Sequence, residues 1–137
     1  MARTGEPGSD RAEGHRTADY TVRARSTATF GRVVLSARDQ HVVVDGPVQN
    51  GCPGEALTPA ELFLGGVTTC AVELIHVIAR DSGIDLHSVE AEMAGTIDRE
   101  HAVRSDVTVF RAAALRLTLR GVSDEDGAVL VETFKGR

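Results

Sequence analysis

The sequence predicts an α+β protein with a largely antiparallel sheet. Segments that alternate apolar and polar residues occur in groups on both sides of one long apolar segment, and a short helical pattern ends the chain. Alternation with period two is typical of half-buried strands, whereas an apolar run longer than about 12 residues is typical of a helix. The expected order is therefore β-β-β-α-β-β-α, and grouped strands favour antiparallel pairing.

The chain has 137 residues, of which 42% are hydrophobic and 26% are charged. This length and balance predict one domain whose core needs no disulfide framework. Residues 1–18 contain no aliphatic side chain larger than Ala apart from the initiator Met1, so we expect a disordered tail there and a folded domain over 19–137. The net charge of −5 argues against nucleic-acid binding.

Three strands are expected before the long helix and two after it. The first three cover the alternating or apolar segments 20–25, 30–35 and 41–44, and a Gly/Pro-rich loop follows them. The segments 88–98 and 107–119 alternate again and are expected to form an antiparallel pair. Ser123 is expected to cap a short final helix with an acidic first turn.

The long helix has clear start and stop signals. Thr58 suits the N-cap, Pro59 suits the first helical position, and Glu61 can reach back to the Thr58 amide in a capping box. Ser82-Gly83 is expected to end the helix. Gly65-Gly66 either breaks the helix, so that Cys70 lies near the start of a second segment, or lies inside one continuous helix. We expect the continuous helix.

Between residues 62 and 79 this helix has only two strongly polar residues, Glu73 and His76. A helix that is apolar nearly all round must be covered nearly all round. One small sheet covers one face, so we expect a second copy of the chain to cover the rest in a two-fold dimer, with Gly65-Gly66 allowing close approach. A monomer wrapped by its own sheet and termini is the alternative. We expect no membrane span, because polar, glycine and threonine residues interrupt the apolar run.

Residues 58–70, TPAELFLGGVTTC, resemble the central motif of the OsmC/Ohr family, in which a Pro-Glu-x-Leu-type helix start precedes a cysteine at this distance. The likeness extends over about residues 20–135 and is nearer to the general OsmC-like branch than to the organic hydroperoxide resistance branch. It implies an OsmC-like fold, with an antiparallel sheet packed on a long central helix, and an intertwined homodimer.

The resemblance also implies a thiol-dependent peroxidase that reduces organic hydroperoxides in oxidative stress defence. Cys70 matches the attacking cysteine, which becomes a sulfenic acid. A second cysteine then forms a disulfide with it, and an external dithiol reductant reopens that bond. No cofactor is implied. The alternative is a non-catalytic dimer that binds a small apolar ligand and in which Cys70 is structural.

The sequence departs from the family pattern at the resolving cysteine. The family has a Cys-Pro pair after the last helix, whereas this sequence stops at Arg137, so we expect either a truncated chain or a copy without that cysteine. Cys52-Pro53 is a Cys-Pro pair in the loop before the long helix, which makes Cys52 a possible resolving residue. A peroxidase with one active cysteine, resolved by an external thiol, is a further alternative.

Two charged positions also differ from the family pattern. Peroxidatic members carry a glutamate directly after the motif proline, but here that position is Ala60 and the acid is Glu61, about 100° further around the helix. Glu61 is therefore either a site residue or only a capping residue. An early Gly-Arg turn supplies the arginine that keeps the thiolate charged in hydroperoxide-specific members. Arg32 is the nearest match, and Arg38 is a weaker candidate.

Cys70, Glu73 and His76 are spaced by three residues, so successive side chains drift by about 60° around the helix. We therefore expect no metal site there. Two cysteines are too few for a disulfide-rich secreted scaffold, and no secretory signal is visible. We expect a soluble, cytoplasmic protein with reduced thiols.

Overall fold

The computed structural model describes residues 17–137, so the tail predicted over 1–18 lies almost wholly outside the described residues. The described chain follows the predicted order: three strands, helix α1, two strands and helix α2. A short 3-10 helix, η1 (Val48–Asn50), lies in the loop before α1 and was not predicted. The α+β class and the antiparallel pairing are confirmed.

The first three strands form an antiparallel meander, consisting of β1 (Arg23–Ser26), β2 (Arg32–Ala37) and β3 (Gln40–Asp45). Leu35 in the middle strand pairs with Ala24 on one side and with Val42 on the other. Arg38 has a positive φ of 54° and lies in the tight turn between β2 and β3. It is therefore at the opposite end of β2 from Arg32.

Helix α1 (Pro59–Asp81) is continuous through Gly65-Gly66, as predicted. The Thr58 hydroxyl accepts a hydrogen bond from the Glu61 amide at 3.4 Å and donates one to the Glu61 carboxylate at 2.7 Å. The N-cap is thus confirmed, although the carboxylate contacts the Thr58 hydroxyl rather than its amide. The helix ends at the predicted position, where Gly83 has a φ of +66° that glycine adopts without strain.

The last two strands also pair antiparallel, and they are β4 (Ser88–Thr96) and β5 (Ala112–Arg120). Strand β5 begins later than the alternating pattern from residue 107 predicted. The segment 97–111 forms a loop instead, in which the Asp98 carboxylate accepts hydrogen bonds from the amides of Glu100 and His101. Such a side-chain turn favours a loop over further strand pairing.

Helix α2 (Asp124–Lys135) begins at the predicted cap, where the Ser123 hydroxyl accepts from the Asp126 amide at 3.1 Å. The core lies where α2, β4 and β5 pack on the C-terminal half of α1. Ile75, Ile78 and Leu130 are at most 1% exposed there. The core therefore belongs to one half of the long helix.

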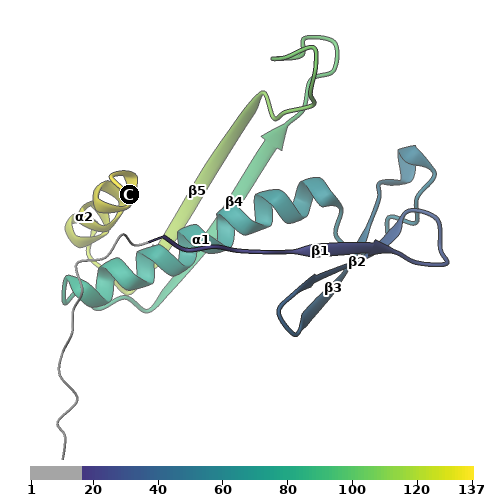
Figure 1. Cartoon of the computed structure of the whole chain (residues 1–137). Helices are drawn as coiled ribbons and strands as arrows, with labels where there is room; N and C mark the ends of the chain where they lie inside the picture. Colours follow the sequence, from purple (N-terminus) through teal and green to yellow (C-terminus); the bar gives the residue numbers. More distant parts are fainter. Residues whose placement is uncertain (1–16) are drawn as a thin grey trace, which may run out of the picture.

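The two sheets lie at different places along α1. The three-stranded sheet lies beside the N-terminal end of the helix, whereas α2 lies beside the C-terminal end (Figure 1). Strand β4 and helix α2 are the main packing partners of α1 within the described chain. The single chain therefore leaves much of the N-terminal half of α1 uncovered.

Candidate functional site

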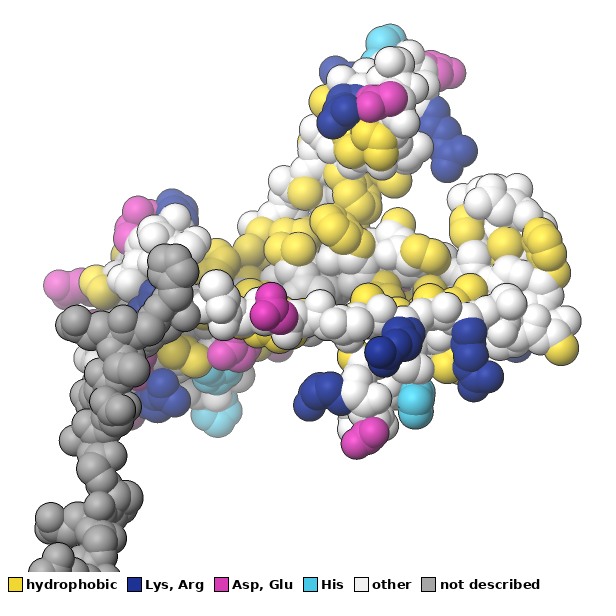
Figure 2. Space-filling model, in the orientation of Figure 1, with side chains coloured by type: hydrophobic (Ala, Val, Ile, Leu, Met, Phe, Trp, Pro, Cys, Tyr) yellow, Lys and Arg dark blue, Asp and Glu magenta, His cyan; other side chains and the backbone are white. Residues whose placement is uncertain are grey.

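The uncovered face of α1 carries the candidate nucleophile. Cys70 is exposed, and Phe63 and Val67, which lie two turns and one turn before it, are 64% and 45% exposed. Figure 2 shows hydrophobic side chains gathered over α1 between the β4–β5 hairpin and the three-stranded sheet. We call residues Phe63, Val67 and Cys70 with the adjoining glycine pair the open face. It places a thiol on an apolar surface.

The glycine pair leaves empty space beside this part of α1. A Cβ atom at Gly65 or Gly66 would meet no atom within 4 Å. The hydroxyls of Thr68 and Thr69 donate to the carbonyls of Leu64 and Gly65 one turn earlier, at 2.7 and 2.9 Å. The helix is thus hydrogen-bonded beside the pair, and nothing in the described chain fills the space above it.

By length and composition alone, α1 is also apolar enough to span a membrane, and most of its apolar stretch is not buried within the described chain. Core helices of soluble proteins have the same composition. Glu73 and His76 are exposed on the same helix. These polar groups would be costly in lipid, whereas an aqueous protein interface accommodates them.

Phe110 closes one edge of the open face, and no pattern in the sequence predicts it there. Its ring stacks on Phe63 with centroids 5.7 Å apart and planes inclined by 18°. Gly95 of β4 makes room for this ring, because a Cβ there would lie 2.8 Å from two Phe110 carbons. The loop before β5 therefore contributes an aromatic side chain to the site.

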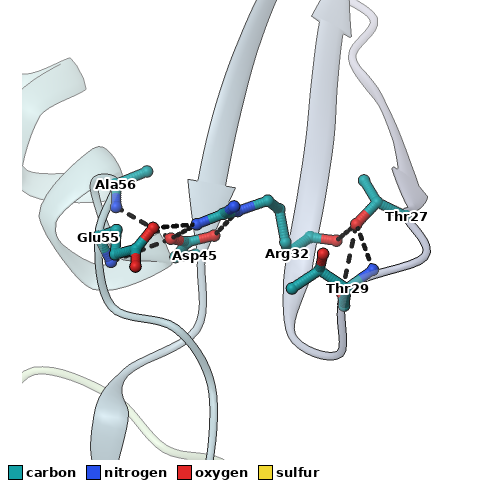
Figure 3. Close-up of polar contacts among 6 residues, drawn as sticks. All are labelled: Thr27, Thr29, Arg32, Asp45, Glu55 and Ala56. Atoms are coloured by element: carbon teal, nitrogen blue, oxygen red, sulfur yellow. Dashed lines mark hydrogen bonds and ion pairs between the residues drawn. The ribbon is translucent and has the colours of Figure 1, made fainter.

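The predicted site arginine, Arg32, is held by two carboxylates. Its Nε and Nη2 atoms donate to the two oxygens of Asp45 at 2.8 and 2.9 Å, and Nη2 also donates to Glu55 at 2.9 Å (Figure 3). Asp45 is fully buried and accepts two further hydrogen bonds, from the amides of Glu55 and Ala56, at 3.0 Å each. These bonds join β2, β3 and the loop before α1.

The electrostatics of this group follow from its contacts. The Arg32 guanidinium, through its hydrogen bonds, holds the pKa of the Asp45 carboxyl well below its usual range, and the two loop amides act in the same direction. The same carboxylates raise the pKa of Arg32. Each charge therefore stabilises the ionised form of the other. Neither Asp45 nor Glu55 was singled out from the sequence.

Cys52, the possible resolving residue, packs against two glycines. A Cβ atom at either Gly31 or Gly46 would overlap its sulfur. The thiol also lines an apolar cavity of about 320 Å³ between the first sheet and the first turn of α1, where Pro59 and Leu62 form part of the wall. Cys52 therefore lies at the level of the start of α1.

Within residues 17–137, none of the four predicted site residues makes a hydrogen bond or ion pair with another of the four. Glu61 is hydrogen-bonded to the cap residue Thr58, and Arg32 is hydrogen-bonded to Asp45 and Glu55. Cys70 is eight residues beyond Leu62, which corresponds to about 12 Å along the helix axis. Within residues 17–137, no group of three or more His, Cys, Asp or Glu residues is arranged to hold a metal ion.

The sequence of this chain matches a known protein family. The profile of the family described as "OsmC-like protein" matches residues 52–134. That range includes both cysteines, the whole of α1 and most of α2. No curated protein sequence matches the chain at a significant level.

Several solved structures share the fold. An OsmC-like protein from Mycoplasma pneumoniae superposes with a TM-score of 0.74 at 12% identity, covering 88% of this chain and 82% of that one. Organic hydroperoxide resistance proteins from Legionella pneumophila (TM-score 0.66, 19% identity, 85% and 82% covered) and Elizabethkingia anophelis (0.68, 14%, 86% and 81%) are also similar. These likenesses show the fold.

Proposed function

Because this chain belongs to the OsmC-like family, we propose that it is a thiol-dependent peroxidase that reduces organic hydroperoxides, with Cys70 as the nucleophile. The observation that carries the proposal is the exposure of Cys70 on the apolar open face of the helix that bears the family motif. Two structural neighbours are named as organic hydroperoxide resistance proteins, which supports the substrate class.

The chemistry requires an accessible thiolate and a surface that favours an organic substrate. The Cys70 thiolate attacks one oxygen of the hydroperoxide, the O–O bond breaks, and the other oxygen leaves as an alcohol after taking up a proton. The sulfur is oxidised by two electrons to a sulfenic acid, and the hydroperoxide is reduced by the same two. Phe63 and Val67 would contact the organic group and favour bulky hydroperoxides over hydrogen peroxide.

The experiment measures consumption of cumene hydroperoxide in the presence of a dithiol reductant. We expect turnover by the native protein and none by Cys70→Ser. Cys52→Ser is the matched control: it removes the other cysteine and separates a resolving role from the attacking role. Equal consumption by the native protein and Cys70→Ser would rule out the proposal.

We also propose that the functional unit is a two-fold homodimer with α1 at the interface. Exposed apolar side chains over half of the helix, together with the empty space above Gly65-Gly66, support a partner that packs closely there. In such a dimer the substrate site lies at the interface. A catalytic cycle that depends on a dithiol reductant further suits a reducing compartment, so we propose a cytoplasmic location.

A second candidate function is non-catalytic binding of a small apolar ligand. The observation that favours it is the apolar cavity beside Cys52, together with an Arg32 side chain that is already engaged by two carboxylates. The pH profile of alkylation of Cys70 discriminates the two functions. Rapid alkylation at neutral pH supports the peroxidase, and a thiol that stays unreactive until strongly alkaline pH supports ligand binding.

A further inference from the structure

The Asp45 carboxylate closes the loop formed by residues 46–58. The loop leaves β3 directly after Asp45 and returns to it, because the amides of Glu55 and Ala56 donate to the carboxylate and the Asp45 amide donates to the Leu57 carbonyl at 3.0 Å. Arg32 holds the carboxylate from the opposite side in Figure 3. A fully buried charge with four hydrogen bonds has little freedom to move.

Cys52 lies inside this closed loop. Its sulfur packs against Gly31 and Gly46, and these two residues are joined by a hydrogen bond from the Gly46 amide to the Gly31 carbonyl at 2.8 Å. The loop therefore holds the thiol beside the first turn of α1. The thiol can leave this place only if the loop moves.

In this position Cys52 is out of reach of Cys70 in the same chain. Cys52 shares its cavity with Leu62 in the first turn of α1, and Cys70 follows Leu62 by about 12 Å along the helix axis. A disulfide requires Cα atoms within about 7 Å of one another. Helix α1 is continuous, so the loop that bears Cys52 would have to open for the pair to form.

We propose that Asp45 is a positioning residue which, by closing the loop 46–58, prevents Cys52 from resolving an oxidised Cys70 of its own chain. The part that concerns oxidised Cys70 rests on the proposed peroxidase function. When the loop opens, the Cys52 thiolate attacks the Cys70 sulfenic acid, an S–S bond forms, the S–O bond breaks, and the leaving hydroxide takes up a proton from solvent to become water. No oxidant other than the hydroperoxide is needed.

The first test uses no hydroperoxide and no Cys70. Two proteins that both carry Cys70→Ser are compared, one with native Asp45 and one with Asp45→Asn. The rate of Cys52 alkylation by N-ethylmaleimide is measured in each. Loss of the charge should weaken all four hydrogen bonds, so we expect alkylation at least about tenfold faster through local opening of the loop. Glu55→Gln is the matched control, because it removes an exposed carboxylate but keeps the amide that bonds Asp45, and should change the rate less than about twofold.

A second variant keeps the test decisive if Asp45→Asn does not fold. Ala56→Pro removes one amide donor to Asp45 and leaves the Arg32 ion pair in place. We expect it also to accelerate alkylation of Cys52, by severalfold. An unchanged rate in a folded Asp45→Asn protein, or in Ala56→Pro where the first variant is unfolded, would overturn the proposal.

The second test follows the disulfide itself by mass spectrometry under non-reducing conditions, after one equivalent of cumene hydroperoxide. The protein with native Asp45 should give no Cys52–Cys70 link within a chain, whereas Asp45→Asn should give that link. An intrachain link of equal yield in both proteins would overturn the proposal. If Cys70 is not oxidised at all, the peroxidase function fails, and the alkylation test still decides the role of Asp45.

Discussion

The two halves of α1 differ in what covers them. All the buried residues of the helix follow Cys70, and three of them, Ile75, Ile78 and Ala79, pack against β4, β5 and α2. Before Cys70, the apolar residues Phe63 and Val67 remain exposed. The same apolar composition thus builds a core in one half of the helix and an open surface in the other. The half that carries the family motif is the half that the single chain covers only in part.

We therefore expect the two halves of α1 to have different roles: the buried half stabilises the fold, and the exposed half contacts a partner or substrate. A buried apolar side chain stabilises the fold of the single chain, whereas an exposed one contributes mainly when a partner or substrate covers it. Variants in the C-terminal half should therefore change unfolding. Variants in the N-terminal half should instead change assembly and reactivity.

The largest effect on stability is expected at the buried half. Leu130→Ala removes a fully buried side chain that packs on α1, and should lower the free energy of unfolding by about 2–5 kcal/mol. Urea denaturation measures this change. Val129→Ala is the control on the same helix, because Val129 is 48% exposed, and it should cost less than about 1 kcal/mol. Equal costs for the two variants would show that the core is elsewhere.

At the open half, Val67→Glu should prevent assembly and leave the fold of the chain intact. A carboxylate buried at a close interface is strongly unfavourable, so we expect dimerisation to weaken by a factor of about 100 or more. Sedimentation velocity measures it. Val129→Glu places the same charge on exposed α2 and should leave assembly unchanged. Unaltered sedimentation of Val67→Glu would exclude the open face from any interface.

Asp45, with its hydrogen bonds to Arg32 and to the amides of the loop before α1, links the first sheet to the start of α1. Its contribution to the free energy of unfolding depends on pH. The pKa of Asp45 is lowered in the folded state, so its stabilisation is complete above about pH 5 and is lost as the pH falls below the range of a free carboxyl group. Unfolding midpoints between pH 3 and 7 should therefore fall steeply with acid in the native protein and less in Asp45→Asn. Asp106→Asn, which removes an exposed ion pair with Arg104, should follow the native curve. An Asp45→Asn curve parallel to the native one would contradict the assignment.

The smallest effect is expected at the helix cap. Thr58→Ala removes the hydroxyl that bonds Glu61 and should cost about 1 kcal/mol, whereas Thr58→Ser retains the cap and should cost less. Amide hydrogen exchange should show the loss mainly in the first turns of α1. Uniformly faster exchange along the whole helix would mean that its two halves unfold together.

The sequence predicted the elements whose signals are local. The caps at Thr58 and Ser123 and the end of α1 at Ser82 depend on neighbours within four residues, and they were found at the predicted positions. The late start of β5 was missed because the turn at Asp98 competes with an alternating pattern that also fits a strand.

The ion pair between Arg32 and Asp45 could not be predicted from local sequence signals. Asp45 is 13 residues away from Arg32, and the two residues meet because they are opposite one another in the β2–β3 register. The stacking of Phe110 on Phe63 likewise depends on how a loop folds back over α1. Knowledge of the hairpin register would have identified the first pair, whereas no local pattern identifies the second.

The mass of the native protein in solution tests most directly whether the open half of α1 is an interface that holds Cys70. Sedimentation equilibrium at micromolar concentration should give twice the mass of one chain, with Cys70 still accessible to alkylation. A mass of one chain at every concentration would contradict this account of the open face.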